Sequence, residues 1–154
     1  MAKKRVFISF GILLALVIGG WAVGASIDWL RNDNLRSAYD AYVASQASDG
    51  IGGKTPQETL DLFVAALRAG DVDLASKYFT VDDRGSREKW VRYFNDLKVK
   101  NLLGVMAEDI ATKAKPAGSS YEGNFGYTIL NKDGTVGVSI DLAHFGVLWK
   151  IENL

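Results

Sequence analysis

The chain contains no cysteine, and this absence excludes several kinds of chemistry. Disulfides, thiolate metal sites, a cysteine nucleophile and a lipid-modified N-terminal cysteine all require that residue. The single histidine, His144, provides no cluster of imidazoles for zinc or iron. Two prolines and the lack of a low-complexity tract argue against extended disorder. We therefore expect a folded chain with no metal site and no cofactor.

Net charge is also lacking, since 18 basic side chains balance 18 acidic ones. The balance is uneven along the chain, because Lys3, Lys4 and Arg5 precede every acidic residue. From Asp28 onward there are 15 basic and 18 acidic residues. Nucleic-acid-binding proteins usually present a basic surface, so we expect no nucleic-acid partner.

An uncharged segment of 22 residues extends from Val6 to Ile27. As a helix it would measure roughly 33 Å, enough to cross a hydrocarbon core of about 30 Å. The basic residues before it place the N-terminus in the cytoplasm by the positive-inside rule. The sequence thus predicts a single-pass cell-membrane protein with a cytoplasmic stub at 1–5, a transmembrane helix at 6–27 and an extracytoplasmic remainder.

A cleaved signal peptide is the alternative interpretation of this segment. Val23, Gly24 and Ala25 are small residues at a spacing that suits signal peptidase. The apolar run is longer than the usual core of about 7–15 residues, which favours an uncleaved anchor. A mature chain beginning at Ser26 would indicate cleavage.

Residues 28–54 are predicted to form a helical stalk and a Gly-rich linker. Leu35, Tyr39 and Tyr42 follow the i, i+4, i+7 spacing of one helix face over 28–47. Such a face packs either on its own domain or on a second copy of the chain. Residues 48–54 contain three glycines and are interpreted as flexible. In the membrane segment, Gly20 and Gly24 have the GxxxG spacing that allows two helices to approach closely. The positions predicted for helix association are therefore Gly20, Gly24, Tyr39 and Tyr42.

Residues 55–154 begin with helix signals. Thr55 to Glu58 form a capping box with proline at the first helical position, and Gly70 is a typical C-terminal cap. Asp71 is expected to cap a short second helix, and Ser86 to start a third. A fourth helix is predicted at about 101–113, and its inward residues are expected to be Leu102, Leu103, Met106 and Ile110. Lys115 to Ser120 are expected to end it.

The remaining residues change to the alternating period of strands. Asn131 to Gly134 form a hairpin turn between two alternating runs, and a second turn is expected at Ala143 to Gly146. The inward residues of the last two strands are predicted to be Val136, Val138, Ile140, Leu142, Val147, Trp149 and Ile151, with Leu148, Lys150 and Glu152 outward. The fold class is therefore α+β, with helices packed on a three-stranded antiparallel sheet.

This domain resembles small bacterial, membrane-anchored members of the nuclear transport factor 2-like (cystatin-like) superfamily. The similarity covers about residues 55–154 and lies in Thr55 to Leu60, in Phe63 to Asp73 with its Ala-Gly-Asp break, and in the closing strand Gly146 to Glu152. It implies helices on a curved antiparallel sheet around a cone-shaped pocket. Three predicted strands are fewer than that group usually has, so we expect a shallow pocket or none. The group includes isomerases, dehydratases and secretion scaffolds, so it implies no single activity.

Catalytic groups are hard to identify in this sequence. Isomerase relatives would require a buried Asp base with Tyr and Asp partners. Asp141 falls on the outward face of its strand, Asp61 on the polar side of the first helix, and Asp82, Asp83 and Asp109 in loops or on helix surfaces. Calcium binding by Asp71 and Asp73 or by Asp82 and Asp83 is not expected, because their spacing does not match an EF-hand loop. His144 falls in a predicted turn and is interpreted as a solvated residue. We therefore expect no enzymatic activity, although an isomerase-like or dehydratase-like enzyme is kept as a less favoured alternative.

Aromatic side chains are the one candidate ligand-binding group. They are expected on inward faces, where they either fill the core or form the walls of a pocket between sheet and helices. The candidate ligand-binding residues are Phe63, Tyr78, Trp90, Tyr127 and Trp149.

The sequence thus favours a non-enzymatic envelope protein, held by a single membrane span, whose domain mediates protein interaction or scaffolding. Its layout is similar to that of single-span scaffold subunits of bacterial secretion systems. The expected partner is a second copy or another envelope protein. A small-molecule-binding domain that uses the aromatic residues is the alternative.

Overall fold

The computed structural model describes residues 33–81, 86–119 and 123–154. Its contacts divide the chain into two compact units, Met1–Tyr42 and Val43–Leu154. Residues 33–47 are helical, so this helix begins in the first unit and ends in the second. The described residues thus agree with the helix predicted over 28–47.

Among the described residues, no helix is both long enough and apolar enough to cross a membrane. The predicted transmembrane segment at 6–27, which includes Gly20 and Gly24, lies outside the described residues. It therefore stays a prediction.

Helix α2 (Pro56–Ala69) begins and ends at the predicted residues. The Thr55 hydroxyl accepts a hydrogen bond from the Glu58 N–H at 3.1 Å, which satisfies one of the free donors of the first turn. Gly70 ends the helix in the left-handed conformation with a φ of 66°, which glycine adopts without steric cost. The buried face of α2 includes Leu60, Phe63, Val64 and Leu67.

Three further helices follow as the sequence predicts. In α3 (Val72–Lys77) the Asp71 carboxylate accepts the Leu74 N–H, and in α4 (Arg87–Val99) the Ser86 hydroxyl accepts the Lys89 N–H. Helix α5 (Leu103–Lys113) has no side-chain cap. Leu102, predicted to face inward, is instead 42 % exposed because it precedes the first helical residue.

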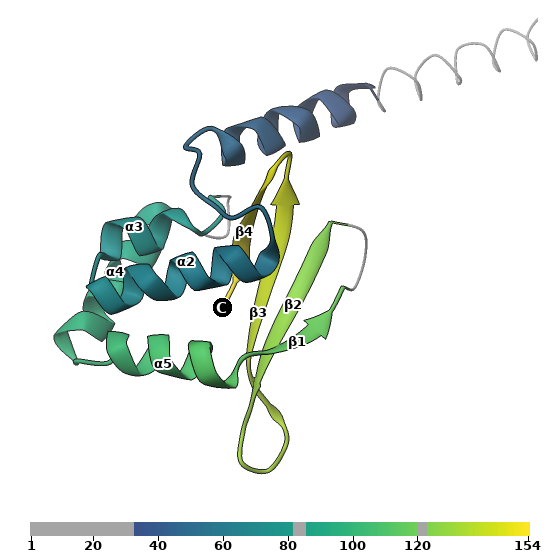
Figure 1. The fold of residues 1–154 in the computed structure, drawn as a ribbon. Helices are drawn as coiled ribbons and strands as arrows, with labels where there is room; N and C mark the ends of the chain where they lie inside the picture. Colours follow the sequence, from purple (N-terminus) through teal and green to yellow (C-terminus); the bar gives the residue numbers. More distant parts are fainter. Residues whose placement is uncertain (1–32, 82–85, 120–122) are drawn as a thin grey trace, which may run out of the picture. The chain divides into compact units, whose positions relative to one another are not determined.

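The sheet contains four antiparallel strands in chain order: β1 (Lys115–Gly118), β2 (Asn124–Leu130), β3 (Val136–Phe145) and β4 (Leu148–Asn153). Figure 1 shows α2 and α5 against this sheet. Tyr127 lies opposite Ile140, and Leu142 lies opposite Ile151. Cross-strand partners share one face, so these residues form the buried side of the sheet.

The α+β class is confirmed, but the expected number of strands is wrong. Residues 115–118, predicted only to end the fourth helix, form the edge strand β1. Pro116 and Gly118 are unfavourable for a strand, and the pairing with β2 shifts between them. A proline is tolerated there because an edge strand needs only one row of its hydrogen-bonding groups.

The second predicted turn is displaced toward the C-terminus. Strand β3 continues through His144 and Phe145, and the turn lies at Gly146 and Val147. His144 is therefore an exposed strand residue and not a turn residue. Val147, predicted to face inward, is 74 % exposed in the turn.

The β2–β3 hairpin extends beyond the helices that cover the sheet (Figure 1). Val136 and Val138, predicted on the buried face, are 58 % and 37 % exposed. Ile140 and Leu142 continue the same alternation and are fully buried. The alternating pattern correctly predicts the strand, but only part of its apolar face has a helix to cover it.

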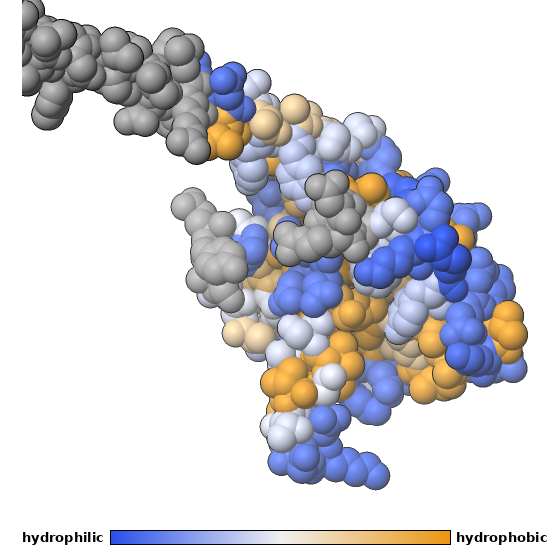
Figure 2. Space-filling view, turned by 180° about the vertical axis from the view of Figure 1, so that it is seen from behind, coloured by the Kyte–Doolittle hydropathy of each residue, from blue (hydrophilic) through white to orange (hydrophobic). Residues whose placement is uncertain are grey.

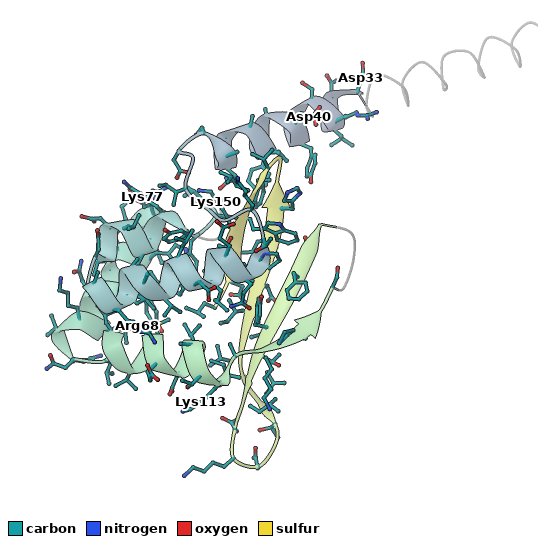
Figure 3. All side chains as sticks on the ribbon, in the orientation of Figure 1. Asp33, Asp40, Arg68, Lys77, Lys113 and Lys150 are labelled. Atoms are coloured by element: carbon teal, nitrogen blue, oxygen red, sulfur yellow. The ribbon has the colours of Figure 1, made fainter. Side chains whose placement is uncertain are left out.

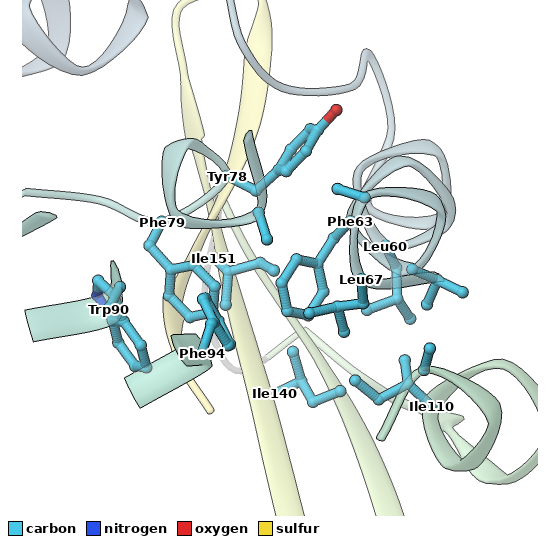
Figure 4. Close-up of a cluster of buried hydrophobic side chains, with 14 of the residues drawn as sticks. Leu60, Phe63, Leu67, Tyr78, Phe79, Trp90, Phe94, Ile110, Ile140 and Ile151 are labelled. Atoms are coloured by element: carbon cyan, nitrogen blue, oxygen red, sulfur yellow. The ribbon is translucent and has the colours of Figure 1, made fainter. Parts of the chain in front are cut away.

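The core lies between the helices and the sheet (Figure 4). Phe63 of α2 and Phe94 of α4 have no exposed surface, and neither do Phe79, Ile140 and Ile151. Aromatic rings supply much of the packing, because each buries a large area and meets its neighbours edge-on or stacked. Phe79, which follows α3, is central, with its ring centroid 5.4 Å from that of Phe63 and 3.9 Å from that of Trp90.

We predict that Phe79→Ala lowers the free energy of unfolding by about 3–5 kcal/mol, because it removes a fully buried ring and leaves a cavity. Urea denaturation followed by tryptophan fluorescence measures this change. Val147→Ala is the control, since a side chain 74 % exposed should change stability by less than about 0.5 kcal/mol. Equal effects at the two positions would contradict the assignment of Phe79 to the core.

Candidate functional site

Three of the predicted ligand-binding aromatics belong to one packed cluster. The centroids of Phe63 and Tyr78 are 6.4 Å apart, and Trp90 reaches the same cluster through Phe79 and Phe94. Phe63, Tyr78 and Trp90 are each no more than 9 % exposed. In this arrangement the three rings pack against other rings of the core.

The other two predicted residues have different neighbours. The Tyr127 ring lies 5.2 Å from Phe125, and its hydroxyl donates a hydrogen bond to Gln57 at 3.0 Å. Trp149 is half-buried, with its ring 5.1 Å from that of His144 on the paired strand. The ring contacts thus join Phe63, Tyr78 and Trp90, whereas Tyr127 and Trp149 each meet a different partner. A shared ligand site stays a prediction.

The two buried tyrosines keep their protons at neutral pH. Burial, and secondarily the charge of Asp71, raises the pKa of Tyr78. Burial, and secondarily the charge of Asp61, raises the pKa of Tyr127. Both hydroxyls are therefore neutral at that pH, and the Tyr127 hydroxyl donates to Gln57.

The acidic residues considered for catalysis make local structural contacts. Asp61 accepts a hydrogen bond from Gln57, Asp141 accepts one from Ser139, and Asp109 pairs with Lys113 at 2.6 Å. Asp82 and Asp83 lie outside the described residues. In the described ranges, no group of three His, Cys, Asp or Glu residues is placed to hold a metal ion.

The polar site that the sequence analysis missed is centred on Lys150 of β4. This residue was predicted to face outward, and that prediction is wrong, because its side chain is only 2 % exposed. Its ammonium nitrogen Nζ donates to Asp49 Oδ1 at 2.9 Å, to Asp49 Oδ2 at 3.1 Å and to the Lys77 carbonyl at 3.1 Å. All three donor positions of the ammonium are therefore used. Figure 3 labels Lys150, together with Arg68 and Lys113 on the exposed surfaces of α2 and α5.

Asp49 also contacts a second cation. Arg87, the first residue of α4, places its Nη2 atom 3.3 Å from Asp49 Oδ2. Its Nη1 atom is buried and has no hydrogen-bond partner among the described residues. We call Asp49, Arg87 and Lys150 the junction cluster, because they connect the segment after helix 33–47 with α4 and β4. This cluster holds two positive charges and one negative charge.

The charges of the junction cluster shift the pKa values of both Asp49 and Lys150. Burial alone would raise the pKa of Asp49, but hydrogen bonds from Lys150 and the Ile51 N–H, with the charges of Lys150 and Arg87, bring it below its ordinary value. Burial lowers the pKa of Lys150, and the attraction of Asp49 offsets only part of that effect. At Lys150 the effect of burial on the pKa outweighs the attraction of Asp49, whereas at Asp49 the neighbouring cations and hydrogen bonds outweigh burial. The difference arises because Lys150 is the more deeply buried partner. Asp49 is thus firmly anionic at neutral pH.

Two glycines beside this cluster allow the chain to approach β4 closely. A Cβ atom on Gly52 would lie 2.6 Å from the Trp149 carbonyl oxygen, and one on Gly53 would lie 2.4 Å from the Thr59 nitrogen. The Gly53 N–H donates to the Thr59 hydroxyl at 2.9 Å, and its carbonyl accepts the Trp149 N–H at 2.8 Å. The glycines of 48–54 are predicted to be flexible from the sequence, but Gly52 and Gly53 are needed here for close packing.

A sequence signal for Lys150 exists but is weak. Apolar and polar residues alternate at Trp149, Lys150 and Ile151, and in such a pattern the lysine is expected to point outward. Its partner Asp49 is 101 positions away in a Ser-Asp-Gly sequence that is typical of a turn. Only the fold brings these two residues together.

Comparison of the chain with protein-family models, with curated proteins and with solved structures finds no match. The resemblance to the nuclear transport factor 2-like superfamily thus stays a hypothesis that rests on the residues quoted for it.

We predict that Asp49→Asn lowers the free energy of unfolding by about 2 kcal/mol, because it leaves the Lys150 ammonium buried without a counter-charge. The loss is smaller than for a fully buried pair, since the Asp49 side chain is 29 % exposed. Urea denaturation measures it. The control is Asp96→Asn, which breaks the surface pair with Lys100 and should cost only about 0–1 kcal/mol.

The effect of Asp49 should depend on pH. Its folded-state pKa is lowered, so its contribution is present above the ordinary carboxyl pKa and is lost as pH falls through the folded-state value. Melting temperatures of the unsubstituted protein and of Asp49→Asn should therefore differ at pH 7, and the difference should shrink only as pH falls from about 4 through the lowered folded-state pKa of Asp49. A difference that stays constant to pH 3 would show that charge on Asp49 is not its cause.

Proposed function

We propose that this chain is a non-enzymatic, single-span membrane protein whose extracytoplasmic domain mediates protein interaction or scaffolding. The uncharged segment 6–27 and the basic residues before it support the membrane anchor. In this proposal the N-terminus is cytoplasmic, and the folded unit Val43–Leu154 lies on the other side of the membrane.

The observation that carries the interaction proposal is an apolar stripe on helix 33–47. Leu35 and Tyr39 are four positions apart, on one face of the helix, and are 66 % and 62 % exposed. Large apolar side chains that share a helix face usually pack against another surface. Tyr42 continues the stripe and is half-buried.

A second copy of the same helix is the partner that suits this stripe best. The helix lies a few residues beyond the proposed membrane segment, where Gly20 and Gly24 have the spacing that allows two helices to approach. Confinement of both copies to one membrane raises their effective concentration, so even a modest apolar stripe suffices. The proposed scaffold is therefore a parallel pair of stalks.

Several polar side chains make contacts that stabilise the fold, and this favours a role in protein interaction over catalysis. Asp71 and Ser86 cap helices, Asp49 pairs with Lys150, and Tyr127 is bonded to Gln57. The aromatic residues proposed for ligand binding are packed in the core or against neighbouring strands. Figure 2 shows apolar areas of the surface separated by hydrophilic ones, and the exposed apolar residues occur on helices and on the β2–β3 hairpin alike.

We predict that Tyr39→Cys produces a disulfide-linked dimer in oxidised membranes, because the stripe would bring the two copies of position 39 together. The chain has no other cysteine, so any dimer reports that position alone. Non-reducing gel electrophoresis of membrane fractions measures the yield.

Ser37→Cys is the matched control, since it is exposed and lies on the opposite side of the same helix. Its dimer yield should be several-fold lower than that of Tyr39→Cys. Adding Leu35→Ser or Gly24→Leu to the Tyr39→Cys chain should lower its yield. Equal yields at positions 37 and 39, or none at either, would contradict pairing through the stripe.

A further inference from the structure

Residues 46–53, which we call the strap, contact the rest of the folded unit through a few polar bonds. The Gln46 side chain pairs with the backbone of Val81, accepting its N–H at 2.9 Å and donating to its carbonyl at 2.7 Å. Asp49 then meets Lys150 and Arg87 in the junction cluster. Gly53 completes the attachment through its bonds to Thr59 and Trp149.

The strap also occupies part of the outer edge of β4. The Trp149 N–H donates to Gly53, while the Ile151 N–H donates to Tyr78 and the Ile151 carbonyl accepts the Thr80 N–H. The edge is therefore paired by two short segments, one of which is the end of the strap. Each contact satisfies a backbone group that an edge strand otherwise leaves open.

Apolar burial contributes little to this attachment. Residues 48–50 are exposed, and Ile51 is only half-buried against the core. The Asp49 side chain is 29 % exposed, so water reaches the carboxylate, whereas the Lys150 side chain beneath it is 2 % exposed. Segments with few buried apolar contacts open more readily than the core that they cover.

From this geometry we propose that the strap is an electrostatic latch. With Asp49 on Lys150, the last turn of helix 33–47 is fixed to β4 and α4. With that contact broken, the bonds of Gln46 and Gly53 alone do not hold the strap in place, and residues 48–54 become a flexible tether between the helix and α2. Seven extended residues span about 23 Å, so release increases the distance over which the domain can move.

The latch is closed unless something displaces Asp49. Its departure would remove the carboxylate that accepts two of the three hydrogen bonds of the Lys150 ammonium, and a buried ammonium is unfavourable without a counter-charge. Opening therefore requires hydration of the two cations, another anion in place of Asp49, or loss of the charge on Asp49. The attachment of the strap lies within the folded unit Val43–Leu154 and does not depend on a membrane anchor. Only the distance that the domain can move from the membrane rests on the proposed function.

Distance measurement between two spin labels tests the proposal directly. Ala44→Cys and Val147→Cys place labels at two exposed positions, one in the last turn of the helix and one in the β3–β4 turn. The full chain is labelled, diluted with unlabelled chain in detergent, and measured by pulsed electron paramagnetic resonance. Latching predicts one narrow distance distribution, which becomes broader and longer in Asp49→Asn and in Lys150→Met.

Asp96→Asn is the charge-matched control and should leave the distribution unchanged, because its partner is the exposed Lys100. A second label pair, Arg92→Cys with Val147→Cys, reports whether the folded unit itself is intact in each variant. Trypsin provides an independent readout, since release should increase cleavage after the exposed Lys54 severalfold.

The proposal is overturned if the 44–147 distribution stays narrow in Asp49→Asn while the 92–147 distribution is also unchanged. It is equally overturned if both pairs broaden together, because the cluster would then hold up the whole fold and not the strap alone. Dilution with unlabelled chain makes the measured distances intramolecular. Failure of the latch is therefore distinguishable from failure of stalk pairing, which only the cysteine crosslinks test.

Discussion

The buried ammonium of Lys150 is the constraint that fixes where the segments beside β4 lie. A charge in this position requires oxygen atoms close by, and it obtains them from Asp49 and from the Lys77 carbonyl. These partners come from the segment before α2 and from the end of α3, so one side chain fixes two distant parts of the chain against β4. Such pairs often add less to stability than apolar packing of equal volume, but loss of one partner leaves an uncompensated buried charge.

The helices could be predicted because their signals are local. Thr55, Asp71 and Ser86 each cap the helix that follows them, and Gly70 ends α2 as expected. Strand β1 could not be predicted in the same way, because residues 115–118 contain proline and glycine and become a strand only through pairing with β2. Local preference is decisive for an isolated turn of helix, whereas tertiary contacts decide the fate of a short edge strand.

The candidate site shows the same division. Burial of Phe63, Tyr78, Trp90 and Tyr127 follows from the helical and alternating patterns, and the structure agrees. These patterns show which side chains face inward. They do not show whether the inward rings enclose a cavity or pack against one another. The position of Lys150 was missed for a related reason, since alternation assigns a side chain to a face but does not show that distant residues cover that face.

Strand β4 is the last element of the domain in chain order, and this has a consequence for synthesis. In the sheet, each strand pairs with the strand next to it in the chain. The contacts of Asp49 with Lys150 and of Thr59 with Trp149 instead join residues 101 and 90 positions apart. Translation proceeds at about 5–20 residues per second, so several seconds pass between the synthesis of α2 and that of Ile151. During that interval the helices can pack on one another, whereas the contacts of Asp49 and Thr59 with β4, which have high sequence separation, form last.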